Sequence, residues 1–180
     1  MSTYPDFVSF KVGLAVARTH PLHNGHCYLL NEMLRRCAKS YWFIGSSDKS
    51  RTEECPYTAA ERVSFIATLY SREICEGKLI IKQVKDLGNM DKWGDYILSQ
   101  VPENVDAYFA GTEKDAFPFL KHKIHIENLR RELVYSCKSG TELRKMIREN
   151  NNEWYHYVPS KIWELIDAYN TLMGEGYDYK

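Results

Sequence analysis

Short apolar runs alternate with longer amphipathic stretches along most of this chain. The runs are rich in Val, Ile, Leu and aromatic residues, and they lack the polar–apolar alternation of a half-exposed strand. This pattern is typical of strands buried on both faces of a parallel sheet. We therefore predict strands at 10–17, 40–45, 79–84 and 107–110, and a further strand at 133–136.

The stretches between these runs carry apolar residues at helical spacing. Two of them open on capping boxes, Thr58-Ala-Ala-Glu61 and Ser139-Gly-Thr-Glu142, whose side chains satisfy backbone N–H groups of the first turn. Alternating strands and helices predict an α/β fold, a Rossmann-like parallel sheet with helices on both faces and C-terminal helices. The predicted helices cover 26–39, 58–70, 91–99, 139–150 and 159–172.

Length and composition agree with one globular domain. A chain of 180 residues suits a single domain over 1–180, with a core at 10–172 and short tails. Lys plus Arg and Asp plus Glu each total 24, so no bulk positive field indicates nucleic acid or a membrane as a partner. The five cysteines show no CxxC spacing, and no apolar run approaches ~20 residues. We therefore expect a soluble, cytoplasmic protein.

The candidate chemistry begins in the loop after the first predicted strand, because parallel sheets bind ligands beyond the carboxyl ends of their strands. This loop contains His23-Asn-Gly25-His26 at the point where a helix begins. The unpaired N–H groups and positive dipole of a helix start bind phosphate. Gly25 would let the backbone approach a phosphate, and His23 and His26 would donate hydrogen bonds to it. Arg18, at the strand end, would offer a bidentate guanidinium to a second phosphate.

The same histidines have two other interpretations. His20, His23 and His26 are spaced by three, and histidine is a common zinc ligand. A third interpretation is that they are polar loop residues that bind nothing. Pro21 and Gly25 interrupt any helix that would align the three rings, and the strand-to-helix junction favours phosphate.

A second segment near the other end of the chain has the same logic. Ser139 caps a predicted helix, while Gly140 and Thr141 offer backbone N–H groups and a hydroxyl. Arg144 lies one turn further on, and helical side chains lean back toward the helix start. Taken alone, this segment is a capped helix with a solvated arginine. Together with the first loop, it predicts a triphosphate held between two helix N-termini.

The two motifs together resemble the nucleotidylyltransferase superfamily, whose signatures are a His-x-Gly-His loop and a late Ser-x-Thr-x-x-Arg segment. Within it, the chain looks most like archaeal-type nicotinamide mononucleotide adenylyltransferases, from about Gly13 to Leu172. The similarity includes Arg18, Pro21, Gly45-Ser-Ser, Pro56-Tyr-Thr-Ala-Ala-Glu-Arg62, Asp86, Trp93, Ala110-Gly111, Ser139-Gly-Thr-Glu-Leu-Arg144, and Trp154 with Val158-Pro159.

This resemblance implies an enzyme that transfers AMP from ATP to nicotinamide mononucleotide, with Mg²⁺ bridging the phosphates and no protein carboxylate cage. It implies catalytic roles for His23, His26, Arg18 and Arg144, and self-association of the chain. The implied ATP-binding residues are Ala17, Arg18, His23, Gly25, His26, Ser139, Gly140, Thr141 and Arg144. The implied acceptor-binding residues are Asp86 and Trp93, with Trp93 stacked on the nicotinamide ring; a structural aromatic is the other interpretation of Trp93.

Some positions depart from the family pattern. His20 replaces a glutamine, Met90 stands where an asparagine is usual, and Thr112-Glu113 replaces Asn-Pro. Other acceptors of the superfamily therefore stay open: nicotinate mononucleotide, phosphopantetheine, a flavin mononucleotide or a cytidylyl acceptor. A nucleotide-binding sensor without turnover is the non-enzymatic alternative. Lys49 and Arg51 form part of a polar loop that either closes over phosphates or is solvated.

Overall fold

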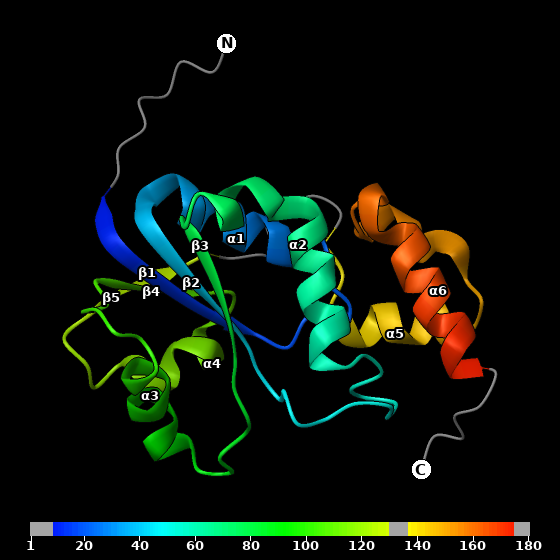
Figure 1. The fold of residues 1–180 in the computed structure, drawn as a ribbon. Coiled ribbons are helices and arrows are strands. Elements are labelled where there is room, and N and C mark those ends of the chain that lie inside the picture. Colours follow the sequence, from blue (N-terminus) through cyan, green and yellow to red (C-terminus); the bar gives the residue numbers. More distant parts are fainter. Residues whose placement is uncertain (1–8, 130–136, 175–180) are drawn as a thin grey trace.

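The sheet consists of parallel strands in the order β3-β2-β1-β4-β5 (Figure 1). The computed structural model describes residues 9–129 and 137–174. Because β1 lies at the centre, the chain moves outward in one direction through β2 and β3 and then returns to β4 on the other side. The predicted Rossmann-like α/β fold is confirmed. The strands are β1 Phe10–Ala17, β2 Cys37–Ile44, β3 Leu79–Gln83, β4 Ala107–Ala110 and β5 His125–Asn128.

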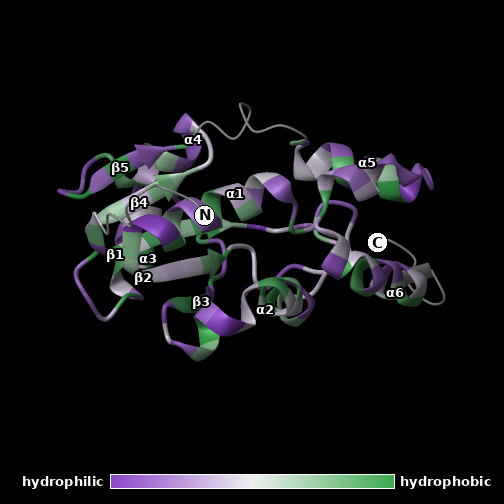
Figure 2. Ribbon diagram, turned by 90° about the horizontal axis from the view of Figure 1, so that it is seen from above, coloured by the Kyte–Doolittle hydropathy of each residue, from purple (hydrophilic) through white to green (hydrophobic). Residues whose placement is uncertain are grey.

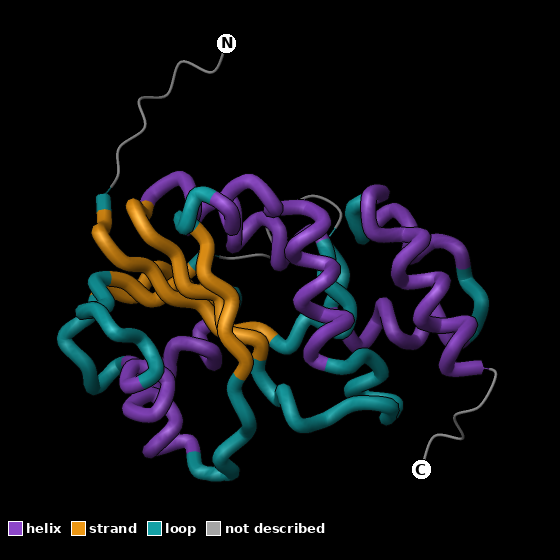
Figure 3. Tube along the Cα trace, viewed as in Figure 1, coloured by secondary structure: helices purple, strands orange, loops and turns teal. Residues whose placement is uncertain are grey.

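Helices cover both faces of the sheet, as Figure 3 shows. On one face, Ala15 and Trp42 pack into a core shared with α1 Asn24–Arg36 and α2 Ala59–Cys75. On the other face, neighbouring strand residues such as Leu14 and Phe43 pack with α3 Met90–Ser99, α4 Glu113–Ala116 and the 3₁₀ turn η1 Phe117–Phe119. This division follows from strand geometry, in which successive side chains point to opposite faces.

The C-terminal helices extend the core on the side of α2 (Figure 1). Buried Ile162 and Ile166 belong to the same cluster as Phe65 of α2, and the Tyr57 hydroxyl donates to Asn170 Oδ1 at 3.0 Å. Figure 2 shows that α5 and α6 each carry both hydrophilic and hydrophobic residues, as expected of helices with one buried face. The elements are α5 Gly140–Arg148, η3 Asn152–Tyr157, η4 Ser160–Ile162 and α6 Trp163–Gly174.

Several predicted boundaries were wrong. The first helix ends at Arg36 rather than 39, and β2 begins at Cys37 without a loop, because buried Cys37 is already extended and pairs with Phe10. The second helix continues beyond Tyr70 to Cys75 after a kink at Tyr70, whose backbone is non-helical. The last segment begins with the 3₁₀ turn η4 before α6.

Strand β5 was not predicted. Its sequence, His-Ile-Glu-Asn, is mostly polar, and its side chains are half-buried or exposed at the sheet edge. The predicted strand at 133–136 lies outside the described residues. Across residues 9–129 and 137–174, no helix combines the length and apolar character that crossing a membrane requires.

Candidate functional site

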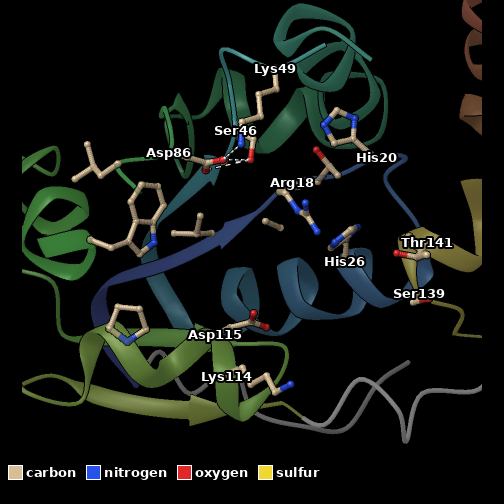
Figure 4. A pocket seen from close by; sticks show the side chains of 18 of the residues that line it. Arg18, His20, His26, Ser46, Lys49, Asp86, Lys114, Asp115, Ser139 and Thr141 are labelled. Carbon is tan, nitrogen blue, oxygen red and sulfur yellow. Dashed lines mark hydrogen bonds and ion pairs between the residues drawn. The ribbon is translucent and has the colours of Figure 1, made fainter. Parts of the chain in front are cut away.

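A cavity of about 650 Å³ opens where the strands end (Figure 4). It lies over the position where strand order reverses between β1 and β4, the place where open α/β sheets bind ligands. Loops after β1, β2, β3 and β4 and the start of α5 all contribute to its walls. Apart from Gly25, the predicted site residues line it: Ala17, Arg18, His23, His26, Asp86, Trp93, Ser139, Gly140, Thr141 and Arg144.

His23 is the N-cap of α1. Its backbone is extended, and its Nδ1 accepts a hydrogen bond from the Gly25 N–H at 3.1 Å. A neutral imidazole that accepts at Nδ1 carries its proton on Nε2. The ring stacks on His26, with centroids 3.8 Å apart, and both histidines are buried. The His-x-Gly-His loop thus forms a rigid pair of imidazoles at the start of a helix.

Gly25 packs inside the first loop. It does not line the cavity, and its N–H is bonded to His23. A Cβ at this position would lie 2.5 Å from Cys137 Sγ and about 3.1 Å from the His23 ring. A side chain here would displace Cys137 or the His23 ring, so the packing of the His23 cap favours glycine. The approach of the Gly25 backbone to a phosphate stays a prediction.

The second motif meets the first at the same cavity. Arg144 of α5 donates from Nη1 to the His20 carbonyl at 3.0 Å. A Cβ on Gly140 would lie 3.3 Å from this carbonyl, so the start of α5 packs directly on the first loop. We call this part of the cavity, formed by Arg18, His20, His23, His26 and residues 139–144, the α1–α5 side.

The hydroxyls of the second motif are already engaged. Ser139 Oγ accepts from the Glu142 N–H at 3.2 Å and also bonds the Glu142 carboxylate, completing the predicted capping box. Thr141 Oγ1 accepts from Arg144 Nη2 at 3.1 Å. These contacts fix the helix start and the arginine rather than presenting two unused hydroxyls to the cavity.

Arg62 is a part of the site that the sequence did not single out beyond its place in the resembling segment. Its side chain is fully buried in α2. It donates to the carbonyls of Arg18 at 2.9 Å, Gly45 at 2.7 Å and Ser46 at 3.1 Å, and to that of Thr58. Burial lowers its pKa. Arg62 therefore ties the carboxyl ends of β1 and β2 together beneath the cavity.

Residues 86–93 form a second part of the cavity, which with Lys114 and Asp115 we call the α3 side. Asp86 accepts from the Ser46 hydroxyl at 2.8 and 3.0 Å and from Lys49 Nζ at 2.8 Å (Figure 4). Partial burial acts to raise the pKa of Asp86, but the bonds from Lys49 and Ser46 outweigh it and lower that pKa. The half-buried Trp93 lines the same part of the cavity.

Two positions that depart from the family pattern, Met90 and Thr112, lie at the starts of α3 and α4. Asn89, immediately before Met90, lines the cavity and caps α3 by accepting from the Asp91 and Lys92 N–H groups. Thr112 caps α4 and bonds Asp115 Oδ2 at 2.9 Å.

The structure bears on two alternatives: that Lys49 and Arg51 close over phosphates, and that the histidines bind zinc. Lys49 binds Asp86, whereas Arg51 forms a two-bond ion pair with Glu61 at the start of α2. Arg51 is therefore held against α2. Within 9–129 and 137–174, no three His, Cys, Asp or Glu side chains are grouped as metal ligands, so the zinc interpretation lacks a ligand set there.

No protein-family model matches the chain. A nicotinamide-nucleotide adenylyltransferase of Methanococcus aeolicus is 29% identical over 156 residues, 86% of this chain and 87% of the relative. The chain is similar to archaeal nicotinamide-nucleotide adenylyltransferases. Relatives of the same name from Thermococcus kodakarensis (29% identity, 87% of this chain and 82% of the relative) and Archaeoglobus fulgidus (27%, 84% and 87%) agree, which confirms the resemblance seen in the sequence.

Solved structures of nicotinamide mononucleotide adenylyltransferases and related enzymes share the fold. A bifunctional NMN adenylyltransferase/ADP ribose pyrophosphatase from Francisella tularensis superposes with a TM-score of 0.74 at 16% identity. The match covers 91% of this chain and 50% of that one, so the chain spans about half of that structure. A nicotinic acid mononucleotide adenylyltransferase of Plasmodium falciparum gives a TM-score of 0.52 at 16% identity, over 94% and 98% of the two chains.

Proposed function

We propose that the chain transfers AMP from ATP to nicotinamide mononucleotide, forming NAD and pyrophosphate. The relatives that span most of this chain carry that activity in their names. The observation that carries the proposal is the meeting of two helix starts, those of α1 and α5, at one cavity. Each helix start carries a positive dipole, which attracts phosphate. The N–H groups of Gly25, His26 and Glu142 are already bonded within their own caps, so the side chains around the two helix starts are the main donors proposed for the phosphates. The cavity volume lies in the range of small-molecule sites.

The proposed mechanism is in-line attack of the acceptor's 5′-phosphate oxygen on the α-phosphorus of ATP. The P–O bond to the β-phosphate breaks as the new P–O bond forms, and pyrophosphate leaves. A phosphate monoester is largely ionised at pH 7, so the protein supplies position and charge stabilisation rather than a nucleophile. The Nε2–H of His23 and the guanidinium groups of Arg18 and Arg144 are the donors proposed for the triphosphate.

A divalent metal fits this site as a companion of ATP. Magnesium binds phosphate oxygens and keeps several waters, so it needs no group of protein ligands, and residues 9–129 and 137–174 form none. When bound, it supplies positive charge to the phosphates. The Francisella bifunctional enzyme, which shares the fold (TM-score 0.70, 15% identity), has a solved complex with AMP and a manganese ion. Magnesium is our proposal for this chain.

The acceptor is proposed to occupy the α3 side. Trp93 offers an aromatic face for the nicotinamide ring, and Asp86 stays ionised because Lys49 and Ser46 bind its carboxylate. A persistent carboxylate suits the positively charged pyridinium of nicotinamide mononucleotide. It is less suited to the additional carboxylate of nicotinate mononucleotide.

An acceptor screen tests the proposal. The protein is incubated with ATP, Mg²⁺ and one acceptor at a time, and the products are identified by mass. We expect the mass of NAD with nicotinamide mononucleotide, at a higher kcat/KM than with the nicotinate, flavin or phosphopantetheine acceptors. ATP binding without product from any acceptor would support the sensor alternative and contradict the proposal. The expected single domain and self-association stay predictions, measurable by limited proteolysis and light scattering.

A further inference from the structure

His20 is buried in the wall of the cavity without a hydrogen-bond partner for its ring. Its side chain is 2% exposed, and the residue lines the cavity. Among the described residues, neither Nδ1 nor Nε2 has a hydrogen-bond partner. The ring stacks at 6.1 Å on Tyr57, which positions it but satisfies neither nitrogen. A buried polar group of this kind is rare and costs free energy, so it needs an explanation.

The surroundings of His20 are cationic. The positive charges of Arg62, Arg144 and Arg18 all act on its imidazole, and Arg144 also bonds its carbonyl. Burial, together with these three charges, lowers the pKa of His20 to about 2, so the ring is neutral at pH 7. A neutral imidazole has one N–H donor and one acceptor nitrogen. The positive charges of the same three arginines attract an anion to this part of the cavity wall.

We propose that His20 is a substrate-binding residue whose neutral imidazole donates a hydrogen bond to a phosphate oxygen of bound ATP. This inference rests on the proposed function, since it assigns a further ligand to the same triphosphate. The family pattern has glutamine at this position, and an amide also donates without a charge. The histidine therefore keeps the hydrogen-bond capacity of the glutamine without adding a fourth cation.

His20→Phe is the deciding variant, and His20→Gln is its matched control. Phenylalanine keeps the ring that stacks on Tyr57 but removes both nitrogens. Loss of one hydrogen bond to a charged group predicts that His20→Phe weakens ATP binding about tenfold or more, with the KM for the acceptor unchanged. Replacing a buried polar group that lacks a partner by an apolar one is close to neutral, so the Tm without ATP should not fall. His20→Gln should bind ATP nearly as tightly as the wild type.

Titration calorimetry with a non-hydrolysable ATP analogue, thermal unfolding without ligand and the KM for the acceptor give the three readouts. Weaker binding by His20→Phe with an unchanged ligand-free Tm, and recovery in His20→Gln, would support the proposal. Unchanged binding by His20→Phe would overturn it. A lower ligand-free Tm together with equal losses for both substrates would also overturn it, because that outcome marks a structural residue. Failure of the wild-type protein to bind the analogue would instead overturn the proposed function.

Discussion

The two sides of the cavity differ in how their side chains are held. On the α1–α5 side, His20, His23 and His26 are buried, and hydrogen bonds to the backbone fix His23 and Arg144. On the α3 side, Asp86 is exposed, and it is held by the exposed Lys49. Chemistry that is common to a superfamily is thus built into helix starts and strand ends. We propose that acceptor choice depends on the more exposed side chains of the α3 side.

Arg62 holds the strand ends beneath the α1–α5 side, and its loss should have the largest effect, on the stability of the fold. In Arg62→Met, the carbonyls of Arg18 and Gly45 lose the bonds that Arg62 donates, whereas the Ser46 carbonyl keeps a bond from the Lys49 N–H. A buried polar group without a partner costs about 1–3 kcal/mol, so we expect the free energy of unfolding to fall by about 3 kcal/mol or more. Urea unfolding measures this change. Arg72→Met, at an exposed position of the same helix, is the control and should leave the midpoint unchanged.

A variant of His26 tests the proposed catalytic role of the α1–α5 side. Removal of one donor that stabilises transition-state charge typically costs about 100-fold in turnover, so we expect His26→Ala to lower kcat by at least ~100-fold. Steady-state pyrophosphate release measures kcat. The exposed His156, mutated to alanine, should keep wild-type turnover. Near wild-type turnover in His26→Ala would remove the histidine pair from the mechanism.

Variants of Trp93 test the proposed role of the α3 side. If its indole stacks on the acceptor ring, Trp93→Ala should raise the KM for nicotinamide mononucleotide by about tenfold, in the range of an aromatic contact. The KM for ATP should stay unchanged, and Trp93→Phe should recover most of the affinity. Equal increases in both KM values would indicate that Trp93 supports the fold of α3 rather than the acceptor.

Burial of His20 should have a smaller effect, on how the free energy of unfolding changes with pH. In the unfolded chain His20 titrates near 6.5, whereas in the folded protein its pKa is about 2. Below pH 6.5 the unfolded chain therefore binds more protons, and stability falls as the pH falls, by at most about 1.4 kcal/mol per pH unit. The charged groups that act on this ring are Arg18, Arg62 and Arg144. His20→Gln should show a shallower loss of stability between pH 6.5 and 5, measured by urea unfolding. An identical slope in both proteins would contradict the neutral, buried imidazole.

The sequence was informative where local rules act alone. Strands β1 and β4 have the predicted bounds, and both capping boxes form, because these features depend on short apolar runs and adjacent side chains. Strand β5 escaped prediction because its pairing with β4, rather than its own polar sequence, makes it a strand.

The site shows the same division. The motif positions at the helix starts could be identified from spacing, and they line one cavity. The role of Arg62 could not be derived, because its partners lie up to 44 residues away at two strand ends. The packing of Gly25 could not be derived either, since the atom that a Cβ would meet first belongs to Cys137.

Two segments far apart in the sequence, the loop at the start of α1 and the start of α5, are proposed to bind one triphosphate. A crystal structure with Mg²⁺ and a non-hydrolysable ATP analogue measures this most directly. We expect phosphate oxygens within hydrogen-bond distance of both His23 or His26 and the Arg144 guanidinium, between the starts of α1 and α5. A triphosphate that contacts only one of the two helix starts, or that lies outside this cavity, would contradict the account.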